Sequence, residues 1–284
     1  MDLRSLGEAA RRRAFEYLDA GLPAVEPRDS AAVVLLRDGE DGIELCMLMR
    51  SHAMATSGGV PVFPGGLIDP ADGETRWLTG DPTEWAEALG TDRDLARAVV
   101  AGAVRELFEE TGILLAEPRP PGGTMVARTW TAARRDLEAH RLTFADFLAA
   151  RSLGIRTDGL RLWSTWITTE FESRRYRNAF FLAALPAGQE AEDGSTESDG
   201  LRWFRCDDLL AGAASGTLEV LPPQLSIALE LREHRAVADA LAAATAPREV
   251  VLPELRIAGD RLDLILPQHL VDRAAAWRSD EPTR

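Results

Sequence analysis

Residues 105–113 read Arg-Glu-Leu-Phe-Glu-Glu-Thr-Gly-Ile and carry the densest pattern in the chain. At about 100° per residue, Glu106, Glu109 and Glu110 fall within roughly a 100° arc of a helix, and apolar residues occupy the opposite side. The helix therefore packs by one face and presents three carboxylates from the other. Three like charges so close destabilise an isolated helix, and a hard divalent cation such as Mg²⁺ neutralises them. A solvated acidic helix face is the alternative.

The segments around this stretch alternate irregularly between strand and helix patterns. Apolar runs at 31–38 and 43–50 flank a Gly-Glu-Asp-Gly turn and predict a hairpin. The further expected elements are helices over 2–19, 92–111, 131–140, 143–151 and 222–245, strands over 113–117, 160–170, 177–187 and 201–206, and a second hairpin turning at Gly259-Asp260. Strands and helices without regular βαβ alternation predict an α/β fold with a mixed sheet.

Composition excludes several classes of function. The chain has 284 residues and a formal charge of 32 − 46 = −14, and every basic residue is arginine. A P-loop and Schiff-base chemistry both need a lysine. The acidic surface disfavours nucleic acid and anionic membrane as partners, and no apolar run is long enough to span a bilayer. Two cysteines far apart, Cys46 and Cys206, are typical of reduced thiols, so we expect a cytoplasmic protein.

The pattern of 105–113 fits the second half of a known box, Arg-Glu-U-x-Glu-Glu-x-Gly-U with U aliphatic, at every fixed position. Phe-Pro-Gly-Gly at 63–66 lies where the first half belongs. On these residues the chain resembles the Nudix hydrolase family over roughly 29–235. The resemblance implies an α/β/α sandwich with a mixed sheet, and hydrolysis of a diphosphate in a small nucleoside diphosphate derivative. It also implies Mg²⁺ or Mn²⁺ as cofactor.

Further segments resemble one branch of that family, the peroxisomal coenzyme A diphosphatases and their bacterial relatives. They are Leu-Met-Arg-Ser at 48–51, Ser-Thr-Trp-Ile-Thr-Thr-Glu at 164–170, Arg-Arg-Tyr-Arg-Asn at 174–178 and Leu-Pro-Pro-Gln at 221–224, together with an insert inside the box at about 70–95. The branch implies coenzyme A or acyl-coenzyme A as substrate.

Two departures from the family pattern matter. Asp72 stands where the box has its first glutamate, and residues 73–104 separate it from Arg105, so Asp72 or a substitute such as Glu74 serves there. The coenzyme A signature matches at Arg50, Ser51 and Gly59, but Ala55 replaces its second arginine. This replacement keeps ADP-ribose, NADH or another nucleoside diphosphate open as substrate. Asp72 and the insert also leave open that the chain is a non-catalytic binding or regulatory module.

By resemblance, the metal ligands are Glu106, Glu109, Glu110 and the carbonyl of Gly66. The resemblance also implies that the catalytic residues are Glu106, Glu109 and Arg105. Arg105 is expected to orient a box carboxylate, because a guanidinium fork matches a carboxylate. Gly65 and Gly66 let the backbone approach the helix closely, and Gly65 is also a substrate-binding candidate.

Outside the box, Arg50 is a substrate-binding candidate by the signature, and the arginine cluster at 174–177 is either a phosphate clamp or a solvated turn; its members are Arg174, Arg175 and Arg177. Trp163 and Trp166 either stack on a base or lie in the core. Glu197 is the candidate for an additional acid, with Asp193 and Asp199 equally near.

The expected organisation is an N-terminal helical extension over 1–27, a hydrolase domain over 28–235 and a C-terminal extension over 236–284. The extensions pack on the domain or form a dimer contact, so a homodimer stays open.

Overall fold

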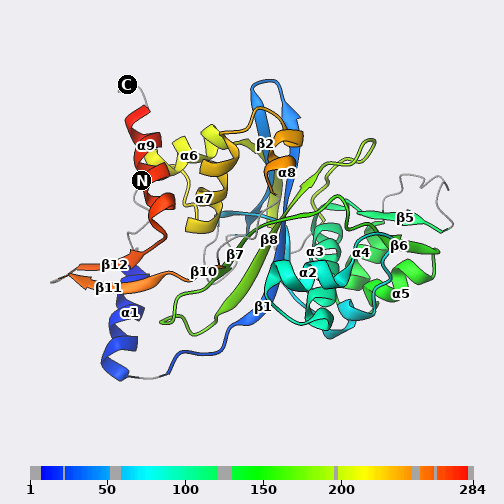
Figure 1. Ribbon diagram of the computed structural model, residues 1–284, viewed down its shortest axis with the longest axis horizontal. Helices are drawn as coiled ribbons and strands as arrows, with labels where there is room; N and C mark the ends of the chain where they lie inside the picture. The colour runs from blue at the N-terminus through cyan, green and yellow to red at the C-terminus, as the bar shows by residue number, and fades with distance from the viewer. Residues whose placement is uncertain are drawn as a thin grey trace.

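The computed structural model of the protein describes residues 8–21, 23–51, 59–119, 130–194, 198–244, 250–258 and 261–280 (Figure 1). In chain order the elements are α1 (Glu8–Ala20), β1 (Arg28–Gly39), β2 (Gly42–Arg50), β3 (Pro61–Val62), β4 (Gly65–Leu67), the 3₁₀ helix η1 (Pro70–Glu74), α2 (Pro82–Leu89), α3 (Arg93–Thr111), β5 (Ala116–Pro118), α4 (Thr131–Glu138), α5 (Phe144–Ala149), β6 (Leu153–Ile155), β7 (Arg161–Ile167), β8 (Tyr176–Ala184), β9 (Ser198–Arg205), α6 (Cys206–Ser215), α7 (Pro222–Leu231), α8 (Val237–Ala243), β10 (Val250–Val251), β11 (Glu254–Ala258), β12 (Arg261–Ile265) and α9 (Gln268–Asp280).

The main sheet is mixed and has eight strands within the described residues. Its longest strand, β1, runs parallel to β8 and antiparallel to both β2 and β4. The two antiparallel partners share one side of β1: β4 pairs with 30–32, and β2 pairs with 36–39. The predicted hairpin of β1 and β2 is confirmed. Because β2 pairs only with the second half of β1, the Gly65-Gly66 backbone of β4 lies beside the first half.

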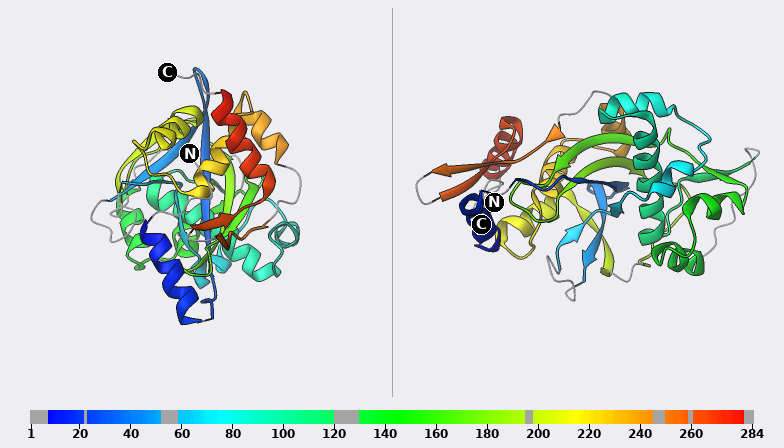
Figure 2. Two further views of the ribbon diagram at one scale, coloured as in Figure 1. Left: turned by 90° about the vertical axis from the view of Figure 1, so that its left-hand side faces the viewer. Right: turned by 90° about the horizontal axis from the view of Figure 1, so that it is seen from below.

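Side chains of β1 alternate between two hydrophobic cores, as a strand covered on both faces requires. One core holds Ala32, Val34 and Leu36 with residues of α6, α7, α8 and α9. The other holds Ala31, Val33 and Leu35 with residues of α2, α3, α4 and α5. Figure 2 shows the two groups of helices on opposite sides of the sheet. The predicted α/β/α sandwich with a mixed sheet is therefore confirmed.

The first and last described elements, α1 and β11 to α9, lie at one end of the molecule (Figures 1 and 2). Ala14 of α1 packs in a small core with Phe171 of the β7–β8 connection and with Leu262 and Leu264 of β12. The hairpin predicted for the tail is confirmed by the pairing of β11 with β12. Its expected turn at Gly259-Asp260 lies outside the described residues.

The C-terminal segment also joins the main fold: β10 pairs with β7, and Trp277 of α9 is buried in the core beneath α7. Nothing in these contacts marks a boundary at 27 or 235, and the division into three parts stays a prediction.

Two predicted elements differ from the structure. The expected helix over 222–245 is wrong as one helix, because it breaks between α7 and α8. The break turns α8 so that the Val237 N–H donates to Asp38 Oδ1 at 2.8 Å and Ala240 is buried. The expected strand over 113–117 begins only at Ala116, because Ile113 and Leu114 fill the core between α3 and β5.

No helix in the described ranges is both long and apolar enough to cross a membrane.

Candidate active site

The helix that carries the predicted site, α3, is fixed at both ends by local signals. The Asp92 carboxylate accepts from the Leu95 N–H at the N-terminus, and Gly112 ends the helix with a φ of 75°. Only a residue that tolerates the left-handed region suits that C-cap. The apolar face of α3 lies against the sheet: Val100, Val104 and Leu107 are fully buried. The carboxylates of the last two turns consequently project along the other side of the helix.

The strand β4 approaches these carboxylates because it contains two glycines. The Gly65 N–H donates to Glu110 Oε2 at 2.8 Å. A Cβ atom at Gly66 would lie 2.5 Å from Glu106 Oε1, closer than a side chain permits. A Cβ atom at Gly65 would lie 2.4 Å from the Ala31 carbonyl oxygen. The predicted close approach of this backbone to the helix is present; Glu106 requires glycine at Gly66, and the neighbouring strand β1 requires it at Gly65.

Arg105 lies at the centre of the site and is almost fully buried. Its Nε and Nη2 donate to the two oxygens of Asp72 at 2.7 and 3.1 Å. Its Nη1 donates to Glu106 Oε1 at 2.8 Å and to Glu109 Oε1 at 3.1 Å, and Nη2 also donates to the Leu67 carbonyl at 2.8 Å. One guanidinium thus positions three carboxylates and the end of β4. Asp72, the unusual residue of the box, lies inside this network.

The site carries more negative charge than Arg105 balances. Burial raises the pKa of Glu109 to about 7, against the attraction of Arg105, and the charges of Glu106 and Asp72 raise it further. Carboxylates and the Gly66 carbonyl are the hard oxygen donors that Mg²⁺ and related cations take. The donor chemistry and the excess charge therefore fit a divalent cation.

Within the described residues, no three acidic, histidine or cysteine side chains are already gathered as a cage. Glu109 is held by Arg105, and Glu110 by the Gly65 N–H. Chelation requires these carboxylates to turn toward a common point. The metal role of Glu106, Glu109, Glu110 and Gly66 accordingly remains a prediction.

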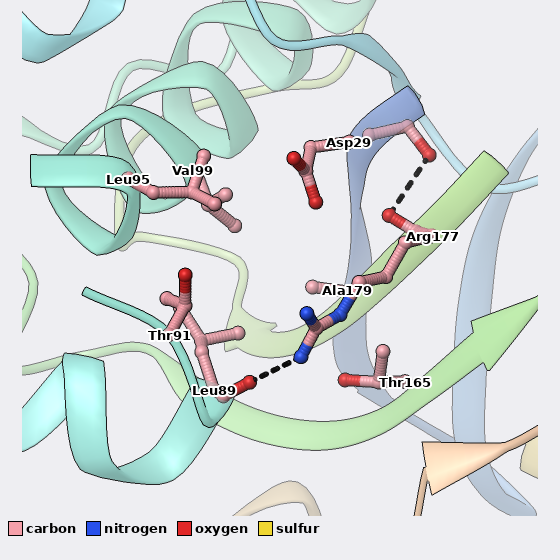
Figure 3. Close-up of a pocket in the computed structure, with 9 residues that line it drawn as sticks. Asp29, Leu89, Thr91, Leu95, Val99, Thr165, Arg177 and Ala179 are labelled. Carbon is pink, nitrogen blue, oxygen red and sulfur yellow. Dashed lines mark hydrogen bonds between the residues drawn. The ribbon is translucent and has the colours of Figure 1, made fainter. Parts of the chain in front are cut away.

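The three clustered arginines do not converge on one point. Arg175 is buried, and its guanidinium donates to the backbone carbonyls of Val25 and Thr168 at 2.8 and 3.0 Å. Arg177 Nη2 donates to the Leu89 carbonyl at 2.6 Å across a small cavity under α2 that Asp29 also lines (Figure 3). Arg174 is exposed. Backbone support for Arg175 and Arg177 is the role that these contacts give, and a shared phosphate clamp has no support in them.

The remaining candidate residues lie on other elements, outside the hydrogen-bond network of Arg105. Arg50 ends β2, where it is registered with Ser198 of β9. Asp193 accepts from Ser198 Oγ at 2.7 Å, Asp199 is exposed on β9, and Glu74 is exposed at the end of η1. Ala55 and Glu197 lie outside the described residues. The two central tryptophans are core residues, with Trp163 1% and Trp166 5% exposed.

One residue of the site was missed by the sequence analysis. Arg134 of α4 is buried, and it donates from Nε to the Glu109 carbonyl at 2.9 Å and from Nη2 to the Glu192 carbonyl at 3.0 Å. It therefore ties the C-terminal end of α3 to the acidic connection between β8 and β9. The available signal was its position between Ala133 and Leu137, which are buried on the same short helix.

An open cleft of about 1020 Å³ begins at this end of α3. Its walls include Gly112, Trp130, Arg134, Leu185 and Gln189.

Comparison with known proteins agrees with this geometry. The model of the NUDT19 Nudix domain matches residues 86–231. The human acyl-coenzyme A diphosphatase NUDT19 is 27% identical over 273 residues, covering 80% of this chain and 72% of the relative, and the chicken protein of the same name is 28% identical over 248 residues, covering 68% and 65%.

A crystal structure of a NUDIX hydrolase from Alicyclobacillus acidocaldarius is similar with a TM-score of 0.65 and 25% identity, covering 77% of this chain and 96% of that one. The family model spans about half of the chain, and the solved structure has the same fold. The chain belongs to the Nudix hydrolase family, a family of pyrophosphohydrolases.

Proposed function

We propose that this chain hydrolyses the diphosphate of a nucleoside diphosphate derivative with Mg²⁺ or Mn²⁺, and that coenzyme A or acyl-coenzyme A is its substrate. The observation that carries the proposal is the arrangement of Glu106, Glu109 and Glu110 against the Gly65-Gly66 backbone around Arg105. The named activity of the acyl-coenzyme A diphosphatases to which the chain is similar supports the substrate. The chain spans 72% and 65% of the length of these two relatives.

The residues of the site have two roles, which are to bind the cation and to position the carboxylates that bind it. Glu106, Glu109, Glu110 and the Gly66 carbonyl would hold the cation. A bound divalent cation offsets the charge of the diphosphate and lowers the pKa of an attacking water. Arg105 fixes the rotamers of Glu106 and Glu109 through two hydrogen bonds from one nitrogen. The glycine backbone of β4 lies directly against the carboxylates of Glu106 and Glu110.

The alternative substrates are ADP-ribose, NADH or a related dinucleotide, and Ala55 favours them because the coenzyme A signature has arginine there. One of the two reasons for considering a non-catalytic binding module was the replacement of the first box glutamate by Asp72, and the structure gives this residue a role. Asp72, the residue that departs from the box, forms the ion pair with Arg105 that holds the site together.

The test is product analysis by mass spectrometry with Mg²⁺ or Mn²⁺ and a metal-free control. The panel contains coenzyme A, acyl-coenzyme A, ADP-ribose, NADH and diadenosine polyphosphates. Release of 3′,5′-ADP from coenzyme A is the expected result. Cleavage of another member alone would keep the chemistry and replace the substrate, and no cleavage of any member would leave the binding module.

Glu109→Gln is the variant that tests the metal assignment, because it removes a charge at the proposed ligand while keeping the shape. We expect a loss of several kcal/mol of transition-state stabilisation, read as kcat/KM. The matched control is Glu87→Gln on the exposed side of α2. Equal activity of the two variants would refute the assignment.

We also propose a compartment and an assembly for this chain. Cys46 and Cys206 are both free and buried, which supports a reducing compartment such as the cytoplasm. Phe15 and Leu18 on α1 are 38% and 39% exposed, which supports a contact between two copies through this helix.

A further inference from the structure

A strip of polar side chains crosses the sheet face opposite α3, level with the two glycines of β4. Ser30 pairs with Leu67 on one side and with Asn178 on the other, and Asn178 pairs with Trp166. In the next row, Ala32 pairs with Gly65 and with Phe180, and Phe180 pairs with Ser164. Because paired residues face the same side of a sheet, both rows point away from α3. We call Ser30, Asn178 and Ser164 the polar strip.

Two members of the polar strip carry atoms that the protein leaves unsatisfied. Asn178 Oδ1 and Ser164 Oγ are buried and have no hydrogen-bond partner among the described residues. A buried polar atom without a partner is less stable than one that forms a hydrogen bond. Yet both residues are partly exposed, so the strip borders solvent. The two oxygens themselves lie just below the surface of these residues, and a ligand that pairs with them would explain why the protein leaves them unsatisfied.

The strip lies at the right distance from the diphosphate site. Neighbouring strands are about 4.8 Å apart, so Asn178 on β8 lies about 10 Å from the β4 backbone, and Ser164 on β7 one strand further. Ala32, which is buried, and Gly65 lie in the same row between Ser164 and the outer edge of β4. The inference therefore requires that a group attached to a diphosphate beside Gly66 extends about 10 Å onto the sheet face opposite α3.

The hydrogen-bonding groups of the polar strip indicate which kind of substrate group would bind there. A side-chain amide offers an acceptor and two donors, and a serine hydroxyl offers one donor and accepts as well. No charged residue belongs to the strip, and Trp166 and Phe180 flank it as buried aromatics. The best match is an uncharged planar group with an N–H beside an acceptor. The edge of an adenine and the secondary amides of a pantetheine arm both have this pattern.

We propose that Asn178, together with Ser164, is a specificity-determining residue that binds an N–H donor in the uncharged part of the substrate. The inference rests on the proposed function, because it assumes a diphosphate held at Gly66. It assigns the strip to substrate selection and leaves the hydrolytic step to the carboxylates on α3.

The test compares wild-type protein with Asn178→Leu, which keeps the shape of the amide, and with Ser164→Ala. Ser215→Ala at the exposed end of α6 is the control. Binding of 3′,5′-ADP and of 4′-phosphopantetheine is measured by calorimetry without metal, and kcat/KM is measured for coenzyme A, ADP-ribose and the hypoxanthine analogue of ADP-ribose. We expect Asn178→Leu to lower kcat/KM at least fivefold for a substrate that has the recognised donor.

The pattern of losses identifies the donor. A loss on both coenzyme A and ADP-ribose, with weaker binding of 3′,5′-ADP and little further loss on the hypoxanthine analogue, assigns the adenine amine. A loss on coenzyme A alone, with weaker binding of 4′-phosphopantetheine, assigns a pantetheine amide. Unchanged binding and unchanged kcat/KM in folded Asn178→Leu and Ser164→Ala would overturn the proposal. If wild-type protein turns over no substrate, the proposed function fails, and the calorimetry still tests the strip.

Discussion

Asp72 and Arg105 form a buried ion pair that joins the two halves of the Nudix box across the insert. The contacts of Nε with Oδ1 and of Nη2 with Oδ2 make the pair bidentate. The 3₁₀ helix η1 brings the backbone of Asp72 to α3, and the Asp69 N–H donates to its Oδ2 at 2.8 Å. The close approach continues at Gly102, where a Cβ atom would lie 2.8 Å from the same oxygen. An aspartate therefore reaches the arginine from a position where the family has the longer glutamate.

Asp72→Ala should destabilise the protein by about 3 kcal/mol or more, because it leaves the buried charge of Arg105 with one partner fewer. Urea unfolding followed by circular dichroism measures this loss. Glu74→Ala, two residues further along the same 3₁₀ helix and exposed, is the control and should change the free energy of unfolding by less than about 0.5 kcal/mol. Equal stability of the two variants would contradict the role given to the ion pair.

Gly66→Ala should abolish most of the metal-dependent activity with a smaller effect on folding. The new Cβ would meet the Glu106 carboxylate at 2.5 Å, so the carboxylate must leave its position beside β4. Gly73→Ala is the matched control, because the nearest atom to its Cβ is 3.9 Å away. Activity is followed across a Mg²⁺ titration with coenzyme A and ADP-ribose. A Gly66→Ala variant as active as Gly73→Ala would show that Glu106 is not needed in its present position.

The catalytic helix was predictable because its signals are local. The apolar period, Asp92 and Gly112 define α3 within a single segment, and the structure places the ends of the helix at 93 and 111. The partner of Arg105 was not predictable, because Asp72 and Glu74 are equally acidic and two residues apart. Only the fold of η1 distinguishes them, by turning the first inward and the second to solvent.

The sequence also did not show which backbone carbonyls would accept hydrogen bonds from side chains that are distant in the chain. Three arginines within four residues suggest a phosphate site by charge, but charge density does not tell which backbone carbonyls lack donors. The segment before β1 needs a donor at Val25 and the segment after β7 needs one at Thr168, and Arg175 supplies both. Arg134 serves α3 in the same way from a distant helix.

Arg175→Ala should therefore lower stability, by about 1–3 kcal/mol, since the carbonyls of Val25 and Thr168 lose their charged donor. Arg174→Ala, one residue earlier and exposed, should leave stability within about 0.5 kcal/mol. Thermal unfolding of the two variants side by side makes the comparison. A large effect of Arg174→Ala on stability, or none of Arg175→Ala, would reverse the assignment.

The two cysteines should be inert toward alkylation in the native protein. Burial raises the pKa of the Cys46 thiol to about 12, against the nearby charge of Arg37, and burial raises that of Cys206 to about 12 as well. A thiol with a raised pKa stays protonated up to that pH, so at pH 8 the reactive thiolate is almost absent. Iodoacetamide labelling read by mass spectrometry should stay low at pH 8 and become complete in urea. Rapid labelling of native protein would show that one of the thiols is accessible.

Arg134→Ala should loosen the acidic connection that follows β8 and weaken catalysis through it. The Arg134 guanidinium ties the last turn of α3 to Glu192, and the N–H groups of Glu192 and Gly194 donate to the carbonyls of Thr111 and Glu110 at 2.8 and 3.3 Å. Without Arg134, these two amides should exchange hydrogen faster, because their shared support at the helix end is lost.

Hydrogen exchange read by mass spectrometry over 186–194 measures the loosening, and Arg135→Ala, the exposed neighbour on α4, is the control. The carboxylates of Glu109 and Glu110 lie on that same last turn, so kcat should fall with the loss of protection in Arg134→Ala. Faster exchange with unchanged kcat would separate the acidic connection from the catalytic carboxylates. Slow exchange in both variants would mean that Arg134 is not what holds this end of α3.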